Sequence, residues 1–179
     1  MSLADDSNVW VVVADYAAAD QAGKLNIIGG AFQLVGTTPS GQLLTPLAVM
    51  VVLEVPRKYA GEDCALTLEL RNETTGEAAK VPTPDGSMET LRVAQNIPIS
   101  VPAVPGISVP PDVPCRVNFA MQIAPGLPLQ PNNAYAWRVS LDGKHRKGWE
   151  AKFWTVSGPT PPVFGGPSGP ADIPQVSLS

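Results

Sequence analysis

Apolar side chains recur at every second position in several short stretches of the chain, and this spacing predicts β-strands. Leu66, Leu68 and Leu70 alternate with Thr67 and Glu69, as in a strand with one buried face. Residues 8–14 and 43–55 are instead apolar on both faces, which is typical of strands buried between layers. The strands predicted in this way cover residues 8–14, 24–35, 43–55, 66–70, 77–81, 91–99, 117–123, 135–141 and 149–156.

Turn-forming residues separate these stretches, and no long segment has helical periodicity. Residues 15–23 form a polar, alanine-rich connection in which we expect at most one helical turn. Gly29 and Gly30 interrupt the stretch 24–35 and indicate a bulge. Short strands at roughly regular spacing predict an all-β fold, an antiparallel β-sandwich of the immunoglobulin-like or jelly-roll-like kind.

Two segments are too rich in proline and glycine for a helix or a central strand. Residues 98–114 hold six prolines, and residues 158–174 hold six prolines and four glycines with Asp172 as the one charge. The sequence therefore predicts a β-sandwich domain over residues 1–156, with a proline-rich connection at 98–114, and an extended C-terminal arm over residues 157–179.

Both segments contain spaced apolar side chains, and an extended apolar segment holds one position only by lying on something. Polyproline-like backbone loses little entropy on docking, and it can lie in another subunit's groove or add to a sheet edge. For residues 98–114, a simple connection between sheets remains the alternative. The predicted partner-binding residues are Ile107, Val109, Val163, Phe164, Ile173, Val176 and Leu178.

Composition narrows the function classes. Hydrophobic residues make up 44% of the 179 residues, enough for a full core, whereas the net charge of −4 argues against a nucleic-acid binder that depends on a positive field. The N-terminus lacks the basic and apolar regions of a signal peptide, and the longest apolar runs, 9–14 and 47–53, are far too short to span a membrane. We therefore expect a protein made in a cytosol, with no membrane partner.

No arrangement of residues in the sequence predicts catalysis, a metal site or a cofactor. His145 is the one histidine, so it cannot form a Cys/His metal site, and no G-x-S-x-G motif supplies a nucleophile. It lies in the basic run 144–147, which is either a solvated hairpin tip or a contact for an acidic neighbour or a phosphate backbone. The adjacent carboxylates Asp5–Asp6 and Glu62–Asp63 point to opposite faces if they lie on strands.

Cysteine and tryptophan are expected to serve the core. Cys64 and Cys115 lie on predicted strands without a CxxC spacing, so buried free thiols are the first expectation, with a cross-strand disulfide or a reactive thiol as alternatives. The tryptophans, at positions 10, 137, 149 and 154, all lie on predicted strands. We expect them to pack in the core rather than line a ligand groove.

The first third of the chain also contains a recognisable motif, Ala14-Asp15-Tyr16 followed by Gly23-Lys24-Leu25 and Gly29. Here the chain resembles an uncharacterised all-β family of actinobacteria and their bacteriophages, over residues 9 to about 55 and more loosely to 156. The resemblance implies an all-β domain and a phage or actinobacterial origin. It implies no activity.

Together these features favour a non-enzymatic structural protein of a bacteriophage virion, most simply a capsid decoration or accessory protein assembled in the bacterial host cytoplasm. Its expected partners are a major capsid or other virion protein and further copies of itself in a symmetric assembly. The alternative is a soluble binding module of the actinobacterial cytoplasm that recognises a peptide or small ligand.

Overall fold

The computed structural model describes residues 2–20, 23–83, 85–103 and 106–158. Its elements, in chain order, are α1 (Leu3–Asp6), β1 (Asn8–Ala14), β2 (Tyr16–Ala19), β3 (Leu25–Ile28), β4 (Leu34–Thr37), β5 (Leu47–Val55), the 3-10 helix η1 (Arg57–Tyr59), β6 (Asp63–Asn72), β7 (Glu77–Ala78), β8 (Lys80–Pro82), β9 (Met88–Thr90), β10 (Arg92–Pro98), β11 (Cys115–Ile123), β12 (Ala134–Leu141) and β13 (Lys144–Ser157).

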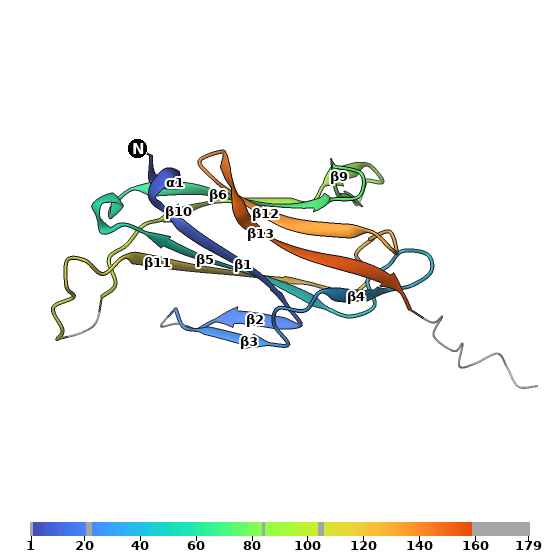
Figure 1. Ribbon diagram of the computed structural model, residues 1–179, viewed down its shortest axis with the longest axis horizontal. Coiled ribbons are helices and arrows are strands. Elements are labelled where there is room, and N and C mark those ends of the chain that lie inside the picture. The colour runs from blue at the N-terminus through green and yellow to red at the C-terminus, as the bar shows by residue number, and fades with distance from the viewer. Residues whose placement is uncertain (1, 21–22, 84, 104–105, 159–179) are drawn as a thin grey trace, which may run out of the picture.

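Two sheets face each other, and a hairpin lies beneath one of them as a third layer (Figure 1). The smaller sheet has the strand order β1-β5-β11, and the larger has the order β10-β6-β12-β13-β4, with β7 added beside β6. All pairs in both sheets are antiparallel except β13 and β4, which are parallel. The predicted all-β antiparallel sandwich is confirmed.

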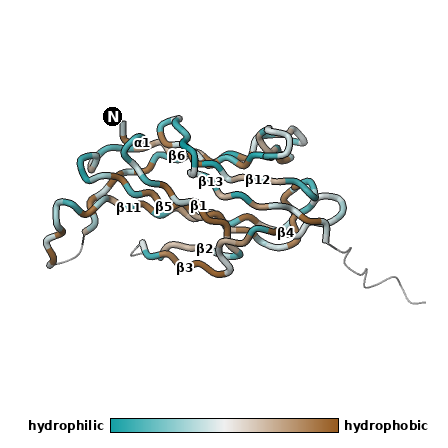
Figure 2. Tube along the Cα trace, in the orientation of Figure 1, coloured by the Kyte–Doolittle hydropathy of each residue, from teal (hydrophilic) through white to brown (hydrophobic). Residues whose placement is uncertain are grey.

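The third layer explains why β5 is apolar on both faces. Val49 and Val51 point into the core between the two sheets, whereas Ala48 and Met50 point the other way and are covered by Ala17 of β2. Each face of this central strand is therefore removed from water, which is the condition under which a strand loses its polar alternation. Figure 2 shows apolar residues along β1 and across the β2–β3 hairpin that covers this sheet.

The core between the sheets is built around large side chains of β12 and β13. Trp137 and Phe153 are fully buried, and the Phe153 ring stacks on Tyr135 with centroids 5.8 Å apart. Burying side chains of this size contributes about 1.5–3 kcal/mol each relative to leaving them exposed. Leu68 and Leu70 of β6 complete this layer, so the half-buried strand predicted from their alternation is confirmed.

Two sequence-based expectations near the N-terminus are wrong. The segment 15–23 was predicted as a connection, but Tyr16–Ala19 within it is a strand that pairs with Leu25–Ile28 as an antiparallel hairpin. The single strand predicted over 24–35 is two strands in different sheets, β3 and β4. Gly29 at φ +63° and Ala31 at φ +61° turn the chain between them, and two left-handed residues so close together end a strand rather than bulge it.

Candidate interaction surfaces

Five of the seven predicted partner-binding residues lie in the arm, beyond the last described residue, Gly158. The other two, Ile107 and Val109, lie in the proline-rich connection between β10 and β11. Whether these two side chains are available for contacts therefore depends on the conformation and exposure of the connection.

The proline-rich connection is fixed to the domain at its base and exposes an apolar side chain further out. Arg57 on η1 donates hydrogen bonds from Nη1 to the carbonyl oxygens of Val109 (3.2 Å) and Pro110 (2.6 Å). Val109 is half-buried, whereas Ile107 is 64% exposed. In Figure 1 this connection and the end of β13 lie at opposite ends of the long axis of the molecule.

A second exposed apolar surface lies where the arm begins. Leu34 and Trp154 are paired in register on β4 and β13, and Val156 follows on the same face of β13. The three side chains, which we call the exit patch, are 64%, 44% and 39% exposed. Gly158 lies two residues after Val156, and its N–H donates to the carbonyl of Thr37 (2.8 Å), so the described chain is held beside the exit patch up to its last residue.

The exit patch overturns part of the tryptophan prediction. Trp137 and Trp149 are buried as expected, but Trp154 and Trp10 stand about half exposed on the outer faces of the two sheets. Period-two alternation on β13, where buried Phe153 and Thr155 flank Trp154, is the sequence signal that identifies it as outward-facing.

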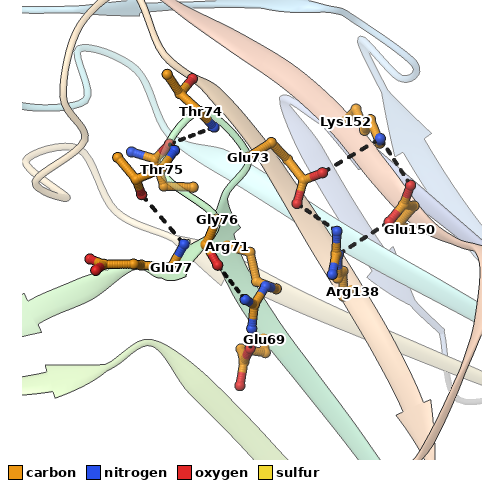
Figure 3. A network of polar contacts seen from close by, with 11 residues as sticks. Glu69, Arg71, Glu73, Thr74, Thr75, Gly76, Glu77, Arg138, Glu150 and Lys152 are labelled. Atoms are coloured by element: carbon orange, nitrogen blue, oxygen red, sulfur yellow. Dashed lines mark hydrogen bonds and ion pairs between the residues drawn. The ribbon is translucent and has the colours of Figure 1, made fainter.

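The outer face of the large sheet beside the exit patch is charged, yet its charges are paired with one another (Figure 3). Arg138 lies between Glu73 (2.8 Å) and Glu150 (3.2 Å). Lys152 contacts the same two carboxylates, and its pKa is raised, mainly by Glu150. Arg71 pairs with Glu69 at 3.0 Å. With three basic and three acidic groups, this surface is an ion-pair network rather than a free charged patch.

The basic run 144–147 is exposed beside the hairpin turn at the start of β13, and two of its residues contact α1. Lys144 Nζ contacts Asp5 Oδ2 at 3.2 Å, and Arg146 donates to the carbonyl of Asp5 at 2.8 Å while its guanidinium lies 5.5 Å from the Trp149 ring centroid. These residues fasten α1 to the start of β13. The pKa of Asp5 is lowered, first by the Ser2 backbone N–H and hydroxyl and then by Lys144.

His145 points to the outer face of the large sheet, in a shallow pocket that also includes Glu69 and Ser140. Its Nδ1 hydrogen-bonds to the Val139 carbonyl at 2.8 Å. Glu69 is held by Arg71, and among the described residues no hydrogen bond links the imidazole to a carboxylate or a hydroxyl. The pocket thus brings an acid, a base and a hydroxyl near each other without the contacts of a catalytic relay.

The cysteines are buried, as predicted, and both are free thiols. Burial, with Asp142 nearby, raises the pKa of Cys64 to about 11, so its sulfur is a protonated thiol at neutral pH. In the described part of the chain, no three His, Cys, Asp or Glu side chains gather closely enough to hold a metal ion. Nor is any helix within it long and apolar enough to cross a membrane.

Comparison with known proteins adds one finding. A protein-family model described as a family of unknown function, DUF6941, matches residues 9–152. None of the curated proteins matches the chain. The matched region begins in β1 and ends within β13, so it takes in both sheets and leaves out the arm.

Proposed function

The chain belongs to DUF6941, a family of unknown function, and from this premise we propose that it is a non-enzymatic structural protein of a bacteriophage virion. In this role the sandwich lies on the capsid as a decoration or accessory protein, and the arm and the proline-rich connection contact neighbouring subunits. The partners are a major capsid or other virion protein and further copies of the chain.

The observation that carries the proposal is the position of the exit patch. Leu34, Trp154 and Val156 expose large apolar side chains beside the point where the proline-rich arm leaves the domain. Apolar groups gathered at one place on a surface commonly mark a protein contact. Tryptophan is also enriched among the residues that dominate binding at interfaces, and aromatic side chains line the grooves that bind proline-rich segments.

The arrangement along the molecule supports the same role. Ile107 lies in the connection at one end of the sandwich, and the exit patch and arm begin at the other. A subunit with contact groups at both ends can touch two neighbours at once. In a symmetric shell, many weak contacts of this kind add up to tight attachment through effective concentration.

The proposal is tested on purified particles. Deleting residues 159–179 should lower the number of copies per particle at least tenfold, and Trp154→Ser should lower it by a smaller factor. The matched control is Lys147→Ser, also exposed on β13 but far from the arm. Unchanged occupancy in the deletion variant contradicts the proposal, as does the absence of the protein from particles.

A pocket of about 400 Å³ at the end of the sandwich supports the second candidate function, a binding module for a peptide or small ligand in a bacterial cytoplasm. Pro39, Pro131 and Tyr135 supply apolar walls, and Glu77 and Lys80 add opposite charges at the rim. Its size matches that of ligand sites in general. Saturable shifts of the Tyr135 NMR signals on titration with proline-rich peptides would favour this function over the virion role.

A further inference from the structure

The four edges of the two facing sheets are not equally protected. On β1, the Val13 carbonyl accepts a hydrogen bond from Ala31, and on β4 the Gly36 carbonyl accepts one from Leu44. Strand β10 ends at Pro98 and exposes polar side chains along its length. Each of these is a common means by which proteins keep a sheet edge from pairing with another chain.

The fourth edge, β11, has polar side chains on its outer face, as β10 has, but in the described chain no neighbouring loop makes a backbone hydrogen bond with it. It is nine residues long, contains no proline and pairs only with β5 among the described residues. Its side chains toward the core are Val117, Phe119, Met121 and Ile123, all apolar and all only half-buried. A long, regular edge with apolar side chains is one that readily accepts a further strand.

The faces of β11 are covered although its edge is open. Its inner side chains pack against the core, and on the outer face Gln122 donates to the Ala17 carbonyl of the β2–β3 hairpin at 2.7 Å. An added strand would pair with its backbone and cover the exposed halves of Phe119 and Met121.

The end of the arm has the pattern that such an added strand needs. Val176 and Leu178 alternate with Gln175, Ser177 and Ser179, so one face is apolar and the other polar, and this stretch has no charged side chain. Residues 159–172 span up to about 45 Å when extended, enough to reach a neighbouring molecule.

The positions of the start of the arm and of the β11 edge favour binding of the arm of one copy to β11 of another copy. Strand β1 packs on β12 and β13, and β4 lies beyond β13, so the arm leaves from the side of the sandwich opposite to β11. Within one molecule the arm must run around the domain to reach its own edge. Between molecules, donor side and acceptor side face each other head to tail, which builds rings or longer arrays.

We infer that residues 173–179 of one copy add as a strand to the free edge of β11 in a second copy. This inference rests on the proposed function for the role of the arm. It adds to that function by naming the surface that the arm binds. The apolar residues Val176 and Leu178 pack beside Phe119 and Met121, and the backbones supply the remaining contacts.

The test uses the full chain in solution, without any capsid protein. Wild type should self-associate with concentration in analytical ultracentrifugation, and hydrogen exchange of amides 115–123 should slow as it does so. Val176→Asp together with Leu178→Asp should weaken association at least tenfold and restore fast exchange in β11. Thr160→Asp with Ser168→Asp adds the same two charges at polar positions of the same arm; it is the matched control and should change neither.

Three results overturn the inference. In the first, the double substitution at Val176 and Leu178 leaves self-association unchanged. In the second, it abolishes self-association but does not change hydrogen exchange in β11. In the third, hydrogen exchange in β11 is slow although the protein is strictly monomeric. The two proposals fail separately. If the arm-deleted protein is lost from particles but hydrogen exchange in β11 does not depend on the arm, only the virion role is supported. If β11 is protected in solution but the protein is absent from particles, only the strand exchange is supported.

Discussion

The side chain of Asp15 occupies the space where a β-carbon at Gly29 would stand. Such an atom would lie 2.6 Å from Asp15 Cγ, and Gly29 has the left-handed φ of +63°. The Asp15 N–H also donates to the carbonyl of Ile28 at 3.1 Å. This hydrogen bond joins the turn between β1 and β2 to the end of β3. The two residues belong to the motif noted in the sequence, and their contact gives it a structural reason.

Gly29→Ala should therefore destabilise the protein by about 2 kcal/mol, roughly half from the left-handed backbone and half from the displaced carboxylate. Gly76→Ala is the matched control, because Gly76 has φ +78° with open space around it, and should cost about 1 kcal/mol. Urea denaturation measures both. In an Asp15→Ala background, the two glycine substitutions should lower the free energy of unfolding equally. Equal losses in the wild-type background would contradict this explanation.

Two adjacent residues on β13 should respond very differently to truncation. Phe153→Ala removes a fully buried ring stacked on Tyr135 and should cost about 3–5 kcal/mol. Trp154→Ala removes a side chain that is 44% exposed and should cost about 1 kcal/mol. Thermal denaturation compares them, and a Trp154 loss as large as that of Phe153 would mean that the exit patch belongs to the core.

The sequence was sufficient for strands whose two faces differ. The alternation at Leu66, Leu68 and Leu70 places β6 correctly, because a half-buried strand records its orientation in its side chains. The sequence was insufficient to place the strands within residues 15–35. The β2–β3 hairpin there packs as a third layer, and its short strands lack a clear alternation of polar and apolar side chains. The partners of β11 and the pairing of Leu34 with Trp154 depend on contacts distant in sequence, which periodicity does not encode.

Cys64 should be unreactive in the folded protein. Because burial raises its pKa to about 11, almost no Cys64 thiolate forms at pH 8. Cys115 is also buried, so Ellman's reagent should reach neither cysteine until denaturant is added. The folded thiol holds its proton at a pH where the unfolded thiol has lost it. Stability should therefore fall as pH rises from about 9 toward 11. Labelling of native protein at the rate of free cysteine would contradict this.

Arg146 should matter more than its neighbour Lys147. Arg146→Ala removes the hydrogen bond to the Asp5 carbonyl and the contact with Trp149, which together contribute about 1–2 kcal/mol. Lys147→Ala should be within about 0.5 kcal/mol of wild type. The loss should appear as faster hydrogen exchange in α1 and the start of β1. Equal exchange in the two variants would show that the cluster does not fasten α1.

Acid should loosen the attachment of α1 through a different set of contacts, those of its two carboxylates. The pKa values of Asp5 and Asp6 are both lowered, Asp5 first by Ser2 and Asp6 first by Lys58. The stabilisation is therefore complete above the ordinary carboxyl pKa of about 4 and is lost as pH falls through the lower folded values. NMR signals of residues 3–6 should shift toward those of a free chain below pH 4, before signals of β6 and β12 change.

The long final strand has a mechanical consequence. β13 is 14 residues long, hydrogen-bonded to β12 on one side and to β4 on the other, and its far end is tied to α1. A force applied to the chain beyond Gly158 pulls this strand lengthwise, so the bonds to both neighbours are sheared together instead of opening one after another. Tension on the arm is thus resisted by the hydrogen bonds that join β13 to β12 and β4 in the large sheet.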